Sequence, residues 1–401
     1  MISSVILRMM ALGLRFVFLI LAAKSLSAAD YTALGGINSL VMISIYFVGF
    51  DLYINLSRKI NDDKIDETGI IIHSTNYATM LVLCSAIVVS VILIIDFKFL
   101  QNVSHFVLAI VIFESLVSEF MRLLISRGEY VKSNFVFLFK NIWVLPLIIM
   151  SIVNIEYSLE QVIKIWLVWV FIISVYSFIG IIVRLQFDFK YAKFSYCLQE
   201  IKSTLVVFLS SLSFLAISNF DKVFLATKSE HDVIREYFIM SSLISVAITI
   251  IYSGVINPLY KKMLSSKNNG EVLEALLKKL NLYSLFVSFG VILVLWLSFP
   301  FVMKYLSFSS DSSYELLLLM SVNMILVVMA LKYHYFLFVK NLDYYIALIS
   351  ISAMVLVCLL VPTLYLEYGV LGVVYALVIS SLFTLSAKYI CYKKESRVSQ
   401  I

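Results

Sequence analysis

The chain has 401 residues, of which 62% are hydrophobic and only 14% charged, and its formal net charge is +6. A bilayer hydrocarbon core of about 30 Å needs about 20 helical residues to cross it, and apolar stretches of that length run along almost the whole chain. This composition leaves no room for a soluble catalytic domain, and the chain is predicted to be a polytopic membrane protein.

Twelve apolar stretches alternate with short polar links. Inside lipid every backbone amide must be satisfied within its own segment, so each stretch is predicted to be a helix. In chain order the stretches are residues 5–23, 35–57, 74–95, 103–123, 134–154, 162–183, 203–220, 237–256, 282–303, 313–335, 344–361 and 369–391. The first 29 residues also fit a cleavable signal peptide, but Arg15 would interrupt its apolar core and a second membrane helix follows at once.

The distribution of lysine and arginine predicts the orientation, because cytoplasmic loops retain these residues. With a cytoplasmic N-terminus, 22 of the 31 lie at one face and 7 at the other, while Arg15 and Lys140 fall deeper inside helices. Both termini are therefore expected in the cytoplasm. The positive net charge reflects this topology, and no nucleic-acid partner is expected.

Several features argue against an enzyme. The loops predicted outside are short, the longest being 221–236, and they offer no acidic pair or large domain with which a membrane polymerase would hold its substrates. The four cysteines lie in helices or on the cytoplasmic side and have no metal-ligand spacing. We find no nucleophile motif and no phosphate-binding glycine loop, so neither a metal nor a cofactor is expected and a transporter is favoured.

The fourth predicted helix carries a stripe of polar residues. At about 100° per residue, the stripe covers about 140° of one face, and its members are Glu114, Ser115, Ser118, Glu119 and Arg122. Ionisable residues at bilayer depth are costly and usually face a water-filled cavity or a partner. The stripe is predicted to line an internal cavity, the alternative being a purely structural interhelical network. Glu119 and Arg122 have the spacing of an ion pair.

Further ionisable residues lie inside other predicted helices. Arg15 suits a diphosphate because its planar fork donates two parallel hydrogen bonds, although it can instead pair with Asp51 or Glu114. Lys140 lies nearly two turns into the fifth helix, where Pro146 predicts a kink. The remaining candidates are the pair Asp221 and Lys222, as a hairpin ion pair or a substrate contact, and Asp51 and Lys332, as gate ion pairs near the cytoplasmic ends.

The chain divides into two halves of six helices. The predicted organisation is an N-terminal bundle over 1–183, a basic and aromatic linker over 184–202, and a C-terminal bundle with a short tail over 203–401. In the linker Phe187, Tyr191 and Phe194 fit an amphipathic interfacial helix, and a solvated loop is the alternative. Arg15 precedes Tyr31 by the same 16 residues that separate Asp221 from Tyr237, which indicates a parallel repeat.

Short motifs resemble those of the O-antigen flippases (Wzx-type) within the multidrug/oligosaccharidyl-lipid/polysaccharide exporter superfamily. The match is best at the seventh helix, where an acidic-basic pair is followed by leucine and then tyrosine. The motifs are residues 221–227 with 234–237, Arg15 with 26–31, 49–58, and 368–376. The resemblance implies an all-α membrane protein of two six-helix bundles around a central cavity, which gives a transported lipid-linked oligosaccharide alternating access to the two faces.

The resemblance further implies a flippase in the bacterial inner membrane that moves undecaprenyl-diphosphate-linked oligosaccharide to the periplasmic face. A coupling cation, H⁺ or Na⁺, and the O-antigen polymerase machinery are its expected partners. Arg15 and Lys140 would attract the diphosphate or acidic sugars, and Glu114 and Glu119 would bind hydroxyls or carry a coupling proton. The alternatives are a cation-coupled multidrug exporter of the same fold, in which the carboxylates matter more than Arg15, and a membrane glycan polymerase.

Overall fold

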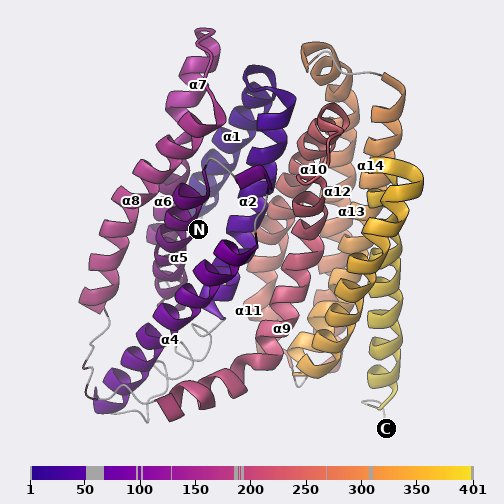
Figure 1. Cartoon of the computed structure of the whole chain (residues 1–401). Coiled ribbons are helices and arrows are strands. Elements are labelled where there is room, and N and C mark those ends of the chain that lie inside the picture. Colours follow the sequence, from indigo (N-terminus) through magenta and orange to yellow (C-terminus); the bar gives the residue numbers. More distant parts are fainter. Residues whose placement is uncertain are drawn as a thin grey trace. The chain divides into compact units, whose positions relative to one another are not determined.

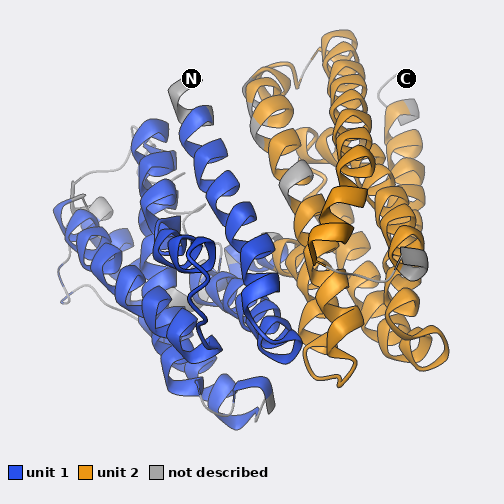
Figure 2. Cartoon of the chain, turned by 90° about the horizontal axis from the view of Figure 1, so that it is seen from above, with its two compact units in different colours: residues 1–208 blue, residues 209–401 orange. Residues whose placement is uncertain are grey.

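The computed structural model describes residues 2–50, 67–95, 98–100, 103–127, 129–184, 188, 190, 194–267, 269–306 and 310–398. Over these residues the chain is helical and contains no strand. It separates into two compact units, residues 1–208 and 209–401 (Figure 2). Each unit is an antiparallel set of long apolar helices joined by short turns (Figure 1).

The described residues of the first unit form seven helices and the start of an eighth. They are α1 (Ile2–Ser25), α2 (Ala28–Gly49), α4 (Glu67–Ile94), α5 (Ser104–Ser126), α6 (Tyr130–Asn141), α7 (Val144–Ile152), α8 (Leu159–Arg184) and the N-terminal part of α9 (Phe194–Leu225). α5 lies at the centre of this unit, in contact with α2, α4, α6 and α8. The polar stripe of α5 is therefore enclosed by helices of the same unit.

The second unit contains the rest of α9 and the helices that follow it. They are α10 (His231–Ile251), a π-helical turn (Tyr252–Ile256), α11 (Asn257–Ser265), α12 (Gly270–Leu306), α13 (Ser310–Val339) and α14 (Asp343–Val398). The π-helical turn precedes Pro258, which has no N–H with which to continue the α-helical bonding. Within this unit α13 packs against both α12 and α14.

Nine of the described helices are long and apolar enough to cross a membrane, or ten if the bent pair α6 and α7 is counted as one span. The prediction of an all-helical, multi-pass membrane protein is thus confirmed. Each of the twelve predicted segments falls on one of these helices or on α5, with α14 containing the last two. The number of twelve crossings and the cytoplasmic position of both termini stay predictions.

Several predicted boundaries were wrong. α2 begins at Ala28 rather than at residue 35, because the Ser27 hydroxyl caps the helix by accepting the Asp30 backbone N–H at 3.1 Å. It ends at Gly49, since Phe50 has a left-handed backbone with φ 45°. α9 and α12 begin nine and twelve residues before the predicted starts at 203 and 282, because helices continue into polar sequence beyond their apolar stretch.

The predicted linker 184–202 falls partly outside the described residues, and so do Phe187 and Tyr191. From Phe194 the chain already belongs to α9, which runs without a break to Leu225. The boundary between the two compact units lies inside this helix, after Phe208. The interfacial role of the linker stays a prediction.

A proline and a glycine change the direction of two spans. α6 and α7 meet at an angle of 43° just before Pro146, because proline cannot donate to the carbonyl four residues earlier; the predicted kink is confirmed. α14 folds back at Gly369, where φ is +59° and ψ −139°. The hydroxyl of Ser380 donates to the carbonyl of Ala353 at 3.3 Å, which places the two halves of α14 side by side (Figure 1).

Candidate functional site

The polar stripe of α5 is buried in the first unit. Glu114 and Glu119 are each 2% exposed, and Ser115 and Ser118 are buried as well. The apolar remainder of the helix supplies the contacts that hold it in place, and the carboxylates point towards side chains from neighbouring helices. Buried carboxylates need partners that supply positive charge or hydrogen-bond donors, and two clusters of such partners surround this stripe.

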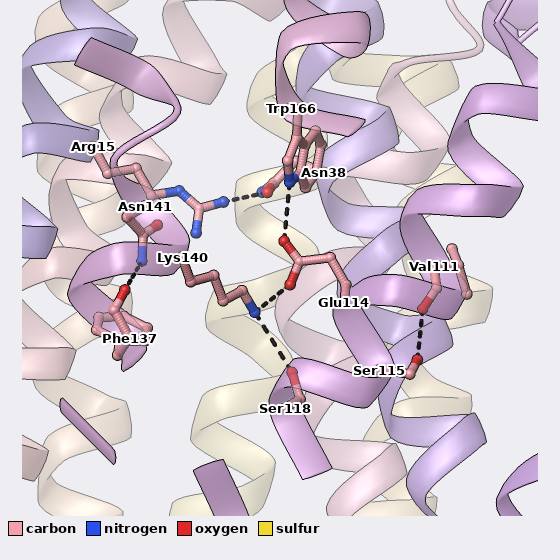
Figure 3. A network of polar contacts seen from close by, with 10 residues as sticks. All are labelled: Arg15, Asn38, Val111, Glu114, Ser115, Ser118, Phe137, Lys140, Asn141 and Trp166. Carbon is pink, nitrogen blue, oxygen red and sulfur yellow. Dashed lines mark hydrogen bonds and ion pairs between the residues drawn. The ribbon is translucent and has the colours of Figure 1, made fainter. Parts of the chain in front are cut away.

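The first cluster is centred on Glu114 (Figure 3). One carboxylate oxygen accepts the indole N–H of Trp166 from α8 at 2.9 Å, and the other forms an ion pair with the ammonium group of Lys140 from α6. Lys140 also lies 3.5 Å from the hydroxyl of Ser118. Three helices are thereby connected through one carboxylate, in a place where the sequence had paired Glu114 only with Arg15.

Arg15 lies beside this cluster, on α1. Its guanidinium donates to the side-chain oxygen of Asn38 on α2 and interacts electrostatically with Glu114. Figure 3 shows Arg15 from α1 and Lys140 from α6 extending towards the same region. The sequence analysis offered Glu114 as one alternative partner of Arg15, whereas the hydrogen-bond partner is Asn38, an asparagine that it did not single out. Asp51, the other predicted partner, lies outside the described residues.

Aromatic packing holds Trp166, the hydrogen-bond donor to Glu114. Trp143, at the bend between α6 and α7, stacks on Trp166 with ring centroids 5.2 Å apart and planes at 8°. Phe18 of α1 meets the edge of Trp143 at 5.2 Å. Trp166 also donates to Glu114. The stacking of Trp143 at the bend on Trp166 therefore helps to keep the Glu114 carboxylate in place beside Lys140. Stacked rings of this kind add about 0.5–1.5 kcal/mol beyond their burial.

The second cluster is centred on Glu119, on the same stripe. Its carboxylate accepts the phenol of Tyr77 on α4 and pairs with Arg122 at 2.5 Å, as the spacing predicted. The Arg122 guanidinium lies 4.9 Å from the ring centroid of Tyr46 on α2. A Cβ at Gly49 would lie 2.3 Å from this guanidinium, so the absence of a side chain on α2 makes room for the ion pair.

In the second unit, Asp221 and Lys222 at the end of α9 bind separate partners. The buried Asp221 carboxylate accepts the phenol of Tyr237 on α10, and the Lys222 ammonium donates to the Ser218 carbonyl at 2.8 Å. The 16-residue spacing that suggested an internal repeat is thus a contact between the two helices of a hairpin. Whether this hairpin touches a substrate stays a prediction.

Lys332, predicted as part of a gate, lies on α13 and pairs with Glu274 of α12 at 2.9 Å. The second carboxylate oxygen of Glu274 accepts the phenol of Tyr392 from α14 at 3.0 Å. These contacts join three helices of the second unit. The proposed partner Asp51 falls outside the described residues, so a gate role for Lys332 stays a prediction.

Sequence reasoning missed one charged and four neutral members of these clusters: Glu274, and Asn38, Tyr77, Trp166 and Tyr392. Asn38 carries a signal that was readable, since an amide in the middle of an apolar helix needs a partner. The tyrosines and tryptophan carry none, because such residues are equally common at membrane interfaces and in apolar packing.

The charge balance decides what the first cluster can do. Among the described residues of this cluster, Arg15 and Lys140 supply two positive charges and Glu114 supplies one negative charge, so one positive charge is in excess. Lys140 is bound to Glu114, whereas Arg15 donates its described hydrogen bond to a neutral amide. A guanidinium in this state retains donors that match an oxyanion such as a phosphate or carboxylate.

No protein-family model and no curated protein matches the chain. Solved structures with the same fold are a multidrug resistance MATE family transporter of the MOP superfamily in an inward-facing conformation (12% identity, 100% of this chain and 99% of that chain, TM-score 0.71) and the lipid II flippase MurJ in an inward closed conformation (14%, 98% and 87%, 0.70). A mutant of the Vibrio cholerae MATE transporter VcmN is also similar (13%, 99% and 99%, 0.64). At these identities the likeness establishes the fold, which is that of membrane transporters and flippases.

Proposed function

We propose that the chain is a flippase that moves an undecaprenyl-diphosphate-linked oligosaccharide, an O-antigen repeat unit, from the cytoplasmic to the periplasmic face of a bacterial inner membrane by alternating access. The observation that carries the proposal is the excess positive charge of the buried cluster formed by Arg15, Lys140 and Glu114. It is supported by the fold, which the chain shares with a lipid II flippase, and by the motifs that resemble O-antigen flippases.

The physical argument concerns the headgroup of the substrate. A polyprenyl diphosphate presents several anionic oxygens, and moving them through a low-dielectric interior needs compensating positive charge. Arg15 supplies a fork geometry that suits two phosphate oxygens. Lys140 is paired with Glu114, so Arg15 is the residue proposed to donate hydrogen bonds to the phosphate oxygens. The prenyl tail stays in the lipid and needs no protein site.

The carboxylates have a separate role in this proposal. Glu114 and Glu119 are buried on the polar face of α5, where they would bind substrate hydroxyls or carry a coupling proton. Protonation of Glu114 would release Lys140 from its ion pair, which would add a second free cation to the cluster. A coupling proton would thereby increase the affinity for an anionic headgroup, and a Na⁺ ion could serve instead where the carboxylates stay ionised.

Complementation tests the proposal. The chain is expressed in a bacterium that lacks its O-unit flippase, together with the glycan genes that accompany this protein, and surface polysaccharide is detected by gel and antibody. Restored surface glycan, with loss of the accumulated lipid-linked unit, is the expected result. Arg15→Ala is expected to abolish export while leaving the protein in the membrane, and Arg127→Ala, which changes an exposed arginine, serves as the matched control. Full export by Arg15→Ala would contradict the role of Arg15.

The second candidate is a cation-coupled multidrug exporter, favoured by the fold likeness to multidrug resistance transporters and by the two buried carboxylates. The multidrug exporter and the flippase predict different results for the same variants. Drug resistance should follow expression of the chain, and Glu114→Gln or Glu119→Gln should abolish it while Arg15→Ala does not. No restoration of surface glycan despite stable membrane expression, together with new drug resistance, would favour this function over the first.

A further inference from the structure

Two further basic side chains, one buried and one half-buried, lie in the second unit next to the contacts of Lys332 and Glu274 described above. Lys388 on the second half of α14 is only 8% exposed. His334 lies on α13, where the adjacent Tyr333 packs against Tyr389, the residue after Lys388, with ring centroids 5.4 Å apart. The Nδ1 atom of the His334 imidazole is buried without a hydrogen-bond partner. Among the described residues no carboxylate pairs with Lys388. A buried ammonium group without a counter-charge is costly in any protein and more so at membrane depth.

The nearby carboxylate of Glu274 already has partners. Glu274 on α12 pairs with Lys332 at 2.9 Å, and its second oxygen accepts the phenol of Tyr392 at 3.0 Å, one turn beyond Lys388. The three helices α12, α13 and α14 therefore bring two cations, an imidazole and one carboxylate to this region. The unsatisfied groups are nitrogen donors on basic side chains, and the ligand that completes such a set is an oxyanion.

The position of Lys388 along α14 indicates which kind of molecule carries the oxyanion. Lys388 lies near the end of α14 at which Lys393 and Lys394 are exposed, and this end is predicted to face the cytoplasm. Tyr333 packs edge-on against Tyr389 at 5.4 Å and lies 5.2 Å from Tyr392, and tyrosines concentrate at the level of lipid headgroups. Basic sites between membrane helices on the cytoplasmic side are suited to anionic headgroups.

We propose that Lys388 and His334 form a binding site for the phosphate group of an anionic lipid headgroup, at the basic end of α13 and α14. Lys388 supplies the charge, and the neutral imidazole of His334 donates a hydrogen bond from Nδ1 in the tautomer that carries the proton there. A bound phosphate would join α13 to the returning half of α14. The inference needs only a membrane-spanning chain, so it stands whether or not the chain transports a lipid-linked oligosaccharide.

The test uses the full-length protein in vesicles and measures its preference for spin-labelled phosphatidylglycerol over spin-labelled phosphatidylcholine. About 0.5 M salt screens the exposed lysines, because the Debye length then falls below about 5 Å. The wild-type protein is expected to prefer phosphatidylglycerol. Lys388→Met should lower that preference about tenfold, the loss expected for a charge-assisted hydrogen bond.

Matched variants keep the result interpretable. Lys393→Met removes the same charge from an exposed position nearby and should change the preference less than twofold, as expected for a screened surface charge. Lys388→Arg retains the charge and should retain most of the preference, which guards against a failure of Lys388→Met to fold. Equal losses in Lys388→Met and Lys393→Met would overturn the proposal, and so would a wild-type protein without any preference at neutral pH.

A competition experiment distinguishes a lipid headgroup from free inorganic phosphate as the ligand. Excess inorganic phosphate in the buffer is expected to leave the lipid preference of the wild-type protein unchanged, because a headgroup is held by its acyl chains as well. Loss of the preference under these conditions would mean that the site takes free phosphate, and the assignment to a lipid would then be wrong.

Discussion

The ion pair between Glu114 and Lys140 allows a quantitative test of the buried network. Lys140→Met removes the cation and leaves a carboxylate that is 2% exposed. Its remaining described hydrogen bond comes from the Trp166 indole at 2.9 Å. Glu114→Gln does the reverse, leaving Lys140 with the hydroxyl of Ser118 at 3.5 Å. The double variant removes both charges at once and keeps the approximate volume of each side chain.

The expected magnitudes follow from burial and partners. Removing one member of a buried ion pair costs about 3–5 kcal/mol, whereas replacing both by neutral groups of similar size is often nearly neutral. For Lys140→Met, the nearby positive charge of Arg15 compensates part of the loss, so about 3 kcal/mol is expected. The double variant should then be more stable than the sum of the two single losses predicts, by at least about 2 kcal/mol.

Reversible unfolding in mixed detergent micelles measures these differences, with helix content followed by circular dichroism. All four proteins of the cycle must be monodisperse before unfolding, so that aggregation does not mimic a stability loss. Lys164→Met is the control, because Lys164 pairs with Glu160 at 2.6 Å but both side chains are about half exposed; a loss below about 1 kcal/mol is expected there. Additive losses at Glu114 and Lys140 would refute the argument that one buried pair governs both.

Two further predictions concern the second unit. Gly372→Ala should destabilise the fold by about 1–3 kcal/mol, because a Cβ there would lie 2.0 Å from the Leu364 carbonyl oxygen; Gly290→Ala, with open space around its Cβ, should instead stabilise by about 0.5–1 kcal/mol, and equal effects in thermal unfolding would contradict the close approach. Tyr237→Phe should cost about 1–3 kcal/mol in the same assay, since the buried Asp221 carboxylate loses its phenol donor, and an unchanged midpoint would mean that another donor replaces it.

The contacts of α5 show which part of its polar stripe the transport hypothesis depends on. The stripe was predicted to line a cavity, and the structure shows its two carboxylates held in hydrogen-bonded clusters within one unit. Such clusters serve a structural purpose in any case, since interhelical polar contacts stabilise helix packing in membranes. A transport role therefore depends on the positive charge in excess at Arg15, and this is why the Arg15→Ala variant is the decisive one.

The sequence alone determined the class of the protein and the places where the membrane helices lie. Long apolar stretches can satisfy their backbone in lipid only as helices, so composition and length suffice, and the charged stripe of α5 and the kink before Pro146 followed from periodicity and from the missing N–H of proline. Boundaries were less accurate, as at Ala28 and Phe194, because helices extend beyond the apolar stretch that reveals them.

Only the tertiary structure decided which side chains meet. Nothing in the sequence pairs Lys140 with Glu114, Tyr77 with Glu119, or Lys332 with Glu274, because these contacts depend on which helices are neighbours and how far each is rotated. The same holds for the fold at Gly369 and for the burial of Lys388 beside His334. Periodicity places a polar residue on a face of its own helix, but its partner and its charge balance are fixed by packing between helices.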